Sequence, residues 1–135
     1  MQPKLTVSTS ERAQLVDITD QVAHIVAESG LMQGLCCLFV PHTTAGITLN
    51  ENWDPTVKRD LLTALEGLVP WSLHYAHAEG NSAAHIKAAL LGASACVPVQ
   101  DSALVLGRRQ GVYLAEFDGP RERVVVVTII EDGVA

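Results

Sequence analysis

The spacing of apolar residues predicts helices in the first two-thirds of the chain and strands before, between and after them. Apolar positions recur at helical spacing in three segments that begin at capping residues. These predicted helices cover residues 17–30, 55–68 and 82–91. Asp54 is the expected N-cap of the second helix, with Pro55 in its first turn. Asn81 or Ser82 is the expected N-cap of the third.

Alternating or continuous apolar runs predict the strands. They cover residues 5–9, 34–40, 47–50, 95–99, 103–106, 112–117 and 123–130. We expect the strand 47–50 to pair with 34–40 across the intervening loop. The segment 124–130 is apolar on both faces, as in a central strand or one at a subunit contact. Helices followed by a closing run of strands predict one α+β domain over residues 1–135.

Composition and net charge indicate which kinds of partner the protein has. Of the 135 residues, 48% are hydrophobic and 18% charged, whereas roughly 25% charged residues is usual. We therefore expect some apolar surface to lie between subunits. The net charge of -6 and the lack of a Lys/Arg cluster argue against a nucleic-acid partner.

The chain has no sign of a membrane span or a secretory leader. No apolar run reaches the roughly 18 residues that a transmembrane helix needs. The segment Met1–Thr6 lacks the layout of a signal peptide, which predicts a cytoplasmic protein. Cys36 and Cys37 would point to opposite faces of a strand, so they are poor partners for each other. With Cys96, they are expected to be reduced, buried thiols.

Histidines at the ends of different elements suggest a metal site. Three imidazoles with one open position are typical of a catalytic zinc site. The candidates are His42, His77 and His85. Glu79 or Glu51 can orient a ligand, His74 is a competing ligand, and His24 is expected at the surface. The plainer interpretation is that His77 and His85 merely flank a capped helix start at Gly80.

Hydroxyl groups and an arginine near the same elements favour an anion. Thr43 and Thr44 follow a buried strand and can bind phosphate oxygens, or simply complete a turn. Arg121, in the turn between two strands, can clamp a phosphate or carboxylate. Asp118 can pair with Arg121, in which case the pair only braces the turn.

Five short motifs occur in an order that resembles the YjbQ family, also labelled secondary thiamine-phosphate synthase. They are His42-Thr43-Thr44-Ala45-Gly46 with Asn50-Glu51, His77 with Glu79-Gly80-Asn81, Ala84-His85, Leu106-Gly107 with Gln110, and Glu116-Phe117-Asp118-Gly119-Pro120-Arg121. The resemblance runs from about Val16 to Ile130. Arg109 stands where an aromatic residue is common, and Ser102 where a turn glycine is usual.

The resemblance implies a single α+β domain with a mixed sheet and two to three helices, assembled as a homotrimer with its sheets around the threefold axis. It also implies a metal-binding enzyme for phosphorylated small molecules, with weak thiamine-phosphate synthase activity. The metal would be zinc-like from the histidines, or magnesium with a diphosphate substrate. The alternative is a non-catalytic trimer that binds a metal or an anion.

The expected roles follow from the motifs and the resemblance together. Glu79 and Arg121 are the expected catalytic residues. His42, His77 and His85 are the expected metal ligands. The expected substrate-binding residues are Thr43, Thr44, Asn81, Gln110 and Asp118.

Overall fold

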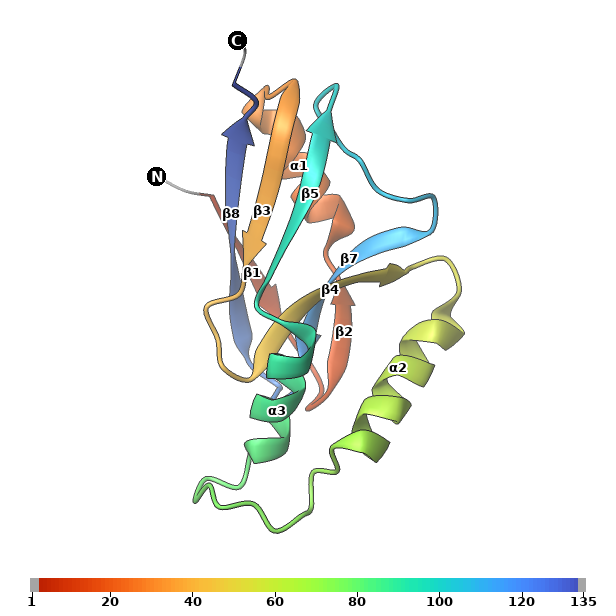
Figure 1. The fold of residues 1–135 in the computed structure, drawn as a ribbon, viewed down its shortest axis with the longest axis vertical. Helices are drawn as coiled ribbons and strands as arrows, with labels where there is room; N and C mark the ends of the chain where they lie inside the picture. Colours follow the sequence, from red (N-terminus) through yellow and green to blue (C-terminus); the bar gives the residue numbers. More distant parts are fainter. Residues whose placement is uncertain (1–2, 134–135) are drawn as a thin grey trace.

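Two antiparallel sheets and three helices make up the computed structural model, which describes residues 3–133 (Figure 1). The strands are β1 Lys4–Ser8, β2 Gln14–Asp17, β3 Gln33–Phe39, β4 Ala45–Glu51, β5 Ser94–Gln100, β6 Ala103–Leu104, β7 Gln110–Glu116 and β8 Glu122–Glu131. The helices are α1 Thr19–Ser29, α2 Pro55–Leu68 and α3 Ser82–Leu91. The predicted α+β class is confirmed.

The sheet topology corrects two expectations. The five-stranded sheet has the order β1-β8-β3-β5-β6, and the three-stranded sheet has the order β2-β7-β4. All described strand pairs are antiparallel, so the mixed sheet is wrong. β4 pairs with β7 rather than with β3, because both edges of β3 are occupied by β5 and β8. The long β4–α2–α3–β5 connection therefore passes from one sheet to the other.

The three-stranded sheet is buried on both of its faces. On one face, Val112 and Leu114 of β7 pack with α1 and the inner face of the five-stranded sheet. On the other face, Tyr113 and Ala115 of β7 pack against α3, with half-buried leucines of α2 beside them. This double burial explains why the chain is continuously apolar from Val112 to Ala115.

The helix ends are set by local sequence, as expected for α2 and only in part for α3. Asp54 accepts a hydrogen bond from the Thr56 amide at 2.9 Å and caps α2. Asn81 occupies the N-cap position of α3, but its side chain makes no capping hydrogen bond. The first amides of α3 are therefore left to water or a ligand.

The described chain gives two further findings about its surface. None of its helices combines the length and the hydropathy needed to cross a bilayer. The expectation of three buried thiols is wrong, because only Cys36 is buried, while Cys37 is half-buried and Cys96 is exposed.

Candidate functional site

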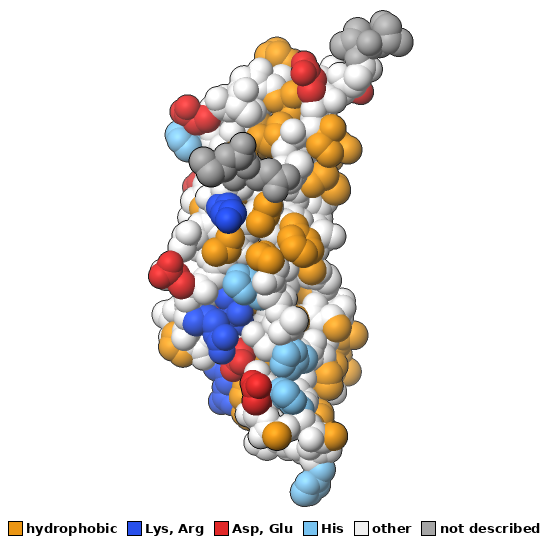
Figure 2. All heavy atoms as spheres, turned by 90° about the vertical axis from the view of Figure 1, so that its left-hand side faces the viewer, with side chains coloured by type: hydrophobic (Ala, Val, Ile, Leu, Met, Phe, Trp, Pro, Cys, Tyr) orange, Lys and Arg blue, Asp and Glu red, His pale blue; other side chains and the backbone are white. Residues whose placement is uncertain are grey.

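Three segments that are distant in the sequence meet beside the start of α3. They are the β3–β4 loop, the connection that leads into α3, and the β7–β8 turn. Together they line a cavity of about 300 Å³, which we call the α3 pocket. Its lining residues are Thr43, Thr44, His77, Glu79, Asn81, His85, Asp118 and Arg121. Figure 2 shows histidine, basic and acidic side chains gathered on the lower half of the face that lies on the left in Figure 1.

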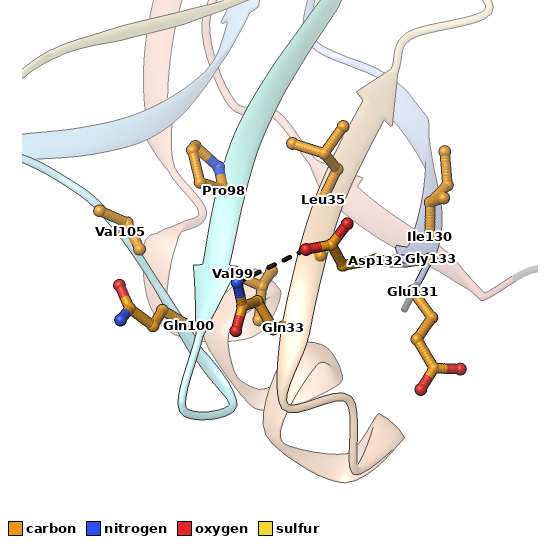
Figure 3. A pocket seen from close by; sticks show the side chains of 11 residues that line it. Gln33, Leu35, Pro98, Val99, Gln100, Val105, Ile130, Glu131, Asp132 and Gly133 are labelled. Atoms are coloured by element: carbon orange, nitrogen blue, oxygen red, sulfur yellow. Dashed lines mark hydrogen bonds between the residues drawn. The ribbon is translucent and has the colours of Figure 1, made fainter. Parts of the chain in front are cut away.

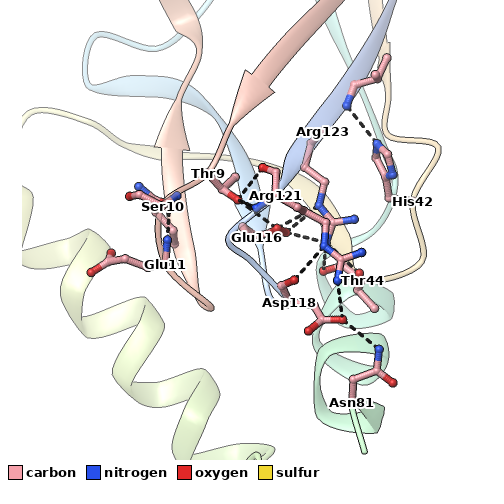
Figure 4. Close-up of polar contacts among 12 residues, drawn as sticks. Thr9, Ser10, Glu11, His42, Thr44, Asn81, Glu116, Asp118, Arg121 and Arg123 are labelled. Carbon is pink, nitrogen blue, oxygen red and sulfur yellow. Dashed lines mark hydrogen bonds and ion pairs between the residues drawn. The ribbon is translucent and has the colours of Figure 1, made fainter. Parts of the chain in front are cut away.

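The pocket rests on a buried ion pair between β7 and β8. Glu116 is 0% exposed and Arg123 is 2% exposed. The Arg123 Nε donates to both oxygens of Glu116, at 2.9 and 2.7 Å, and its Nη2 lies 2.6 Å from Glu116 Oε2 (Figure 4). Arg123 Nη2 also donates to the Thr44 hydroxyl at 2.7 Å. A buried charge pair with this many hydrogen bonds fixes the positions of both strands and of the Thr44 loop.

Thr9 extends this buried network to the turn that carries Arg121. The Thr9 hydroxyl accepts a hydrogen bond from the Arg121 amide at 2.9 Å and lies 3.3 Å from Glu116 Oε1. Gly119 packs so closely here that an added Cβ would lie 2.8 Å from the Thr9 hydroxyl oxygen. Thr9, Glu116 and Arg123 were not among the residues predicted for the site. Arg123 carried a signal, since it directly precedes a run of four valines in a strand predicted to be buried.

The wall of the pocket is a second, more open set of polar contacts. Arg121 Nη2 lies 3.1 Å from Asp118 Oδ2, and the same oxygen accepts from Asn81 Nδ2 at 2.9 Å. The Arg121 side chain is 48% exposed. The Asn81 Oδ1 is buried and has no hydrogen-bond partner within the described chain. A buried acceptor without a partner is costly, so a ligand or water that donates to it would be stabilised here.

Two imidazoles lie on the other side of the pocket. The rings of His77 and His85 are 5.4 Å apart between centroids and meet edge to face at 86°. His77 Nε2 lies 3.9 Å from Glu79 Oε2. Gly80, with a φ of 77°, lets the chain turn between Glu79 and the start of α3.

His42 does not join this pair. Its Nε2 accepts a hydrogen bond from the Val124 amide at 2.9 Å, so the ring is turned toward β8 (Figure 4). Burial and the nearby guanidinium of Arg123 lower the pKa of His42 below its usual value. Among residues 3–133, no group of three or more His, Cys, Asp or Glu side chains is placed to hold a metal ion. The expected three-histidine cluster is therefore wrong, because the His42 imidazole is hydrogen-bonded to the β8 backbone instead.

The remaining candidates lie elsewhere in the chain. Gln110 is at the opposite end of β7 from Glu116 and accepts a hydrogen bond from the Gly107 amide at 2.9 Å. Glu51, at the end of β4, accepts from the amide of Trp53 at 3.0 Å. His24 is exposed on α1, 3.7 Å from Glu28, and His74 is exposed outside the residues that line the pocket.

A larger cavity, of about 570 Å³, lies at the other end of the molecule between β3, β5 and β8 (Figure 3). Its charged lining residues are the carboxylates Glu131 and Asp132, and none of the described residues that line it is basic. The α3 pocket is thus the better candidate for an anionic ligand.

Comparison with known proteins covers almost the whole chain. Residues 3–132 match the family model described as "UPF0047 protein YjbQ-like". The UPF0047 protein MJ1081 of Methanocaldococcus jannaschii is 46% identical over 96% of this chain and 94% of its own length. The UPF0047 protein YugU of Bacillus subtilis is 43% identical over 93% of this chain and 96% of its own length.

Solved structures agree with the fold. A yjbq/upf0047 family protein of Clostridium acetobutylicum has a TM-score of 0.93 and 49% identity, covering 95% of this chain and 99% of its own. A YbjQ-like protein of Sulfolobus solfataricus, described as of unknown function, has a TM-score of 0.92 and 40% identity, covering 96% of each chain.

These findings overturn the functional expectation. The relatives are described only as UPF0047 proteins, and none of these descriptions names a thiamine-phosphate synthase or a metal. The described residues also provide no metal-binding group. The expectation of a metal-binding enzyme with thiamine-phosphate synthase activity is therefore wrong, and so is metal binding in the non-catalytic alternative.

Proposed function

Because the chain belongs to the UPF0047 YjbQ-like family, whose relatives' names state no activity, we propose a function from the pocket itself. The α3 pocket binds a small anion, with the phosphate group of a phosphorylated small molecule as the preferred ligand. The observation that carries this proposal is the half-exposed Arg121 guanidinium on the same pocket as the start of α3, where no side chain caps the helix.

Several donors converge on the same space. The helix start offers backbone amides and the positive end of the α3 dipole. The Thr44 hydroxyl accepts from Arg123, so its own hydrogen stays available to a ligand, and Thr43 adds a second hydroxyl. A guanidinium matches two oxygens of a phosphate at once, which a single ammonium does not.

The pocket also holds two carboxylates, which already contact basic side chains. Glu79 lies 3.9 Å from His77, and Asp118 lies 3.1 Å from Arg121. An anion therefore has to compete with Asp118 for the Arg121 guanidinium. A volume of about 300 Å³ suits a small ligand.

Isothermal titration calorimetry with inorganic phosphate tests the proposal. Arg121→Ala is expected to weaken phosphate binding at least about tenfold, since a charge-assisted hydrogen bond is lost. Arg108→Ala is the matched control, because Arg108 is exposed and lies outside the pocket. Equal affinities for the two variants, or no binding by the wild type, would contradict the proposal.

Assembly and location are further parts of the proposal. The protein is proposed to be a homotrimer in the cytoplasm. Assembly is supported by large hydrophobic side chains that stay exposed on the single chain, among them Leu68 of α2 and Leu90 of α3. Native mass spectrometry measures the number of subunits. The catalytic roles of Glu79 and Arg121 stay predictions.

A further inference from the structure

Cys37 of β3 and Cys96 of β5 lie directly opposite each other in the five-stranded sheet. Their Sγ atoms are 3.1 Å apart. The Val40 amide donates to the Ala93 carbonyl at 2.7 Å, in the same register as the two strands. Because hydrogen-bonded and non-hydrogen-bonded pairs alternate, Cys37 and Cys96, three positions along, form a non-hydrogen-bonded pair, the type in which side chains lie closest.

The three cysteines differ sharply in access. Cys96 is exposed in the single chain and Cys37 is half-buried on the same face of the sheet. The next pair on this face is Leu35 and Pro98, which Figure 3 shows on the neighbouring strands β3 and β5. Cys36 is 0% exposed on the opposite face, and burial raises its pKa to about 11. Cys36 is thus a core residue, whereas the other two can meet a reagent.

We propose that Cys37 and Cys96 are a redox-reactive dithiol, which a small-molecule disulfide such as oxidised glutathione converts into an intramolecular disulfide. A sulfur–sulfur bond is about 2.05 Å long, so the two Sγ atoms need to approach by only about 1 Å. Directly opposed positions on neighbouring strands already satisfy the close Cβ spacing that a disulfide requires.

The reaction follows ordinary thiol–disulfide exchange. The Cys96 thiolate attacks one sulfur of the reagent, forms a mixed disulfide and releases one glutathione thiolate. The Cys37 thiolate then attacks the Cys96 sulfur and releases the second glutathione thiolate, and the two protons lost by the cysteines go to the released thiolates. The two cysteines are oxidised and the reagent is reduced to two thiols.

The order of attack follows from the surroundings of the two sulfurs. The contact with Cys96 and then burial raise the pKa of Cys37, so this thiol keeps its proton longer. Cys96 is the more exposed of the two and reacts first. The bond would close a loop between residues 59 positions apart, which contains β4, α2 and α3.

The test is to treat the native, assembled protein with oxidised glutathione, then denature it, alkylate free thiols and weigh the intact chain. The wild type is expected to lose two hydrogens and to keep one alkylatable thiol, Cys36. Cys37→Ser should stop at one glutathione per chain, attached to Cys96. Cys96→Ser should react at least about tenfold more slowly, because its remaining outer thiol is shielded.

Cys36→Ser is the matched control. It should form the disulfide to the same extent as the wild type and retain no alkylatable thiol. Three outcomes would overturn the proposal: a native wild type that keeps all three thiols, including one protected by a subunit contact; stable mixed disulfides at both outer cysteines; or a disulfide between two chains. Peptide mapping of the wild type, with fragmentation between the adjacent Cys36 and Cys37, identifies the bonded pair, so the answer does not depend on the folding of the variants.

Discussion

Two arginine–carboxylate pairs belong to the β7–β8 connection, one in the flanking strands and one within the turn, and they have opposite surroundings. Arg123 and Glu116 are buried and joined by several hydrogen bonds, whereas Arg121 and Asp118 are partly exposed and face a pocket. The buried pair holds the strands together. The exposed pair contributes little to folding but can exchange one partner for a ligand. Burial, rather than residue type, therefore separates the structural Arg123 from Arg121, the arginine that we propose binds the anion.

The largest expected effect comes from breaking the buried pair. Glu116→Gln keeps the shape of the side chain but leaves the Arg123 guanidinium buried without a counter-charge. We expect the free energy of unfolding to fall by about 3–5 kcal/mol. Urea unfolding measures the change.

Glu122→Gln is the control for that substitution, because Glu122 is exposed at the start of β8. It should leave the free energy of unfolding nearly unchanged. A loss under about 1 kcal/mol for Glu116→Gln would show that the buried pair is not the structural element described above.

The second prediction concerns the exposed pair, where a substitution is expected to strengthen phosphate binding. Asp118→Asn removes the carboxylate that competes for Arg121 while keeping an oxygen that can accept from Asn81. Phosphate affinity is expected to rise about tenfold, or about 1.4 kcal/mol, with little change in unfolding. Calorimetry and urea unfolding on the same sample measure both. An unchanged or weaker affinity would mean that Asp118 does not restrain Arg121.

The smallest expected effect is on the pH dependence of stability and comes from His42, which lies near Arg123 of the buried pair. Its pKa is lowered from the usual 6.5 by burial and by Arg123, so the folded state favours the neutral ring that accepts from the Val124 amide. The stability due to this group is present above its unfolded pKa and is lost as the pH falls through the folded value.

Lowering the pH from about 7.5 to about 5.5 should therefore lower the melting temperature of the wild type more than that of His42→Gln. His24→Gln, which changes an exposed histidine of α1, should keep the wild-type slope. Identical slopes for wild type and His42→Gln would show that the Val124 contact does not depend on the neutral ring.

The predictable parts of the fold were those set by neighbouring residues. The start of α2 follows from Asp54 and Pro55, and α3 ends before Gly92 as its sequence indicates. The partner of β4 was not predictable, because an alternating pattern states which face is buried but not which strand lies beside it. The short strand β2 was missed for the same reason, since it forms only against β7.

The candidate site was predicted in outline, but its three-histidine metal cluster was wrong. The motifs indicated that Thr43, His77 and Arg121 lie at one site, and all three line the α3 pocket. They did not indicate that His42 binds the β8 backbone, because that depends on a contact between residues 82 positions apart. Gln110 was misplaced by the length of β7: six residues of strand span roughly 20 Å.

The most direct test of the central claim is an amide NMR titration of the native protein with inorganic phosphate. If the α3 pocket binds the anion, the signals of Ser82, Ala83 and Thr43 should shift together with one affinity, and Arg121→Ala should weaken all three shifts. Shifts confined to other surfaces, or shifts of these amides that persist unchanged in Arg121→Ala, would contradict it.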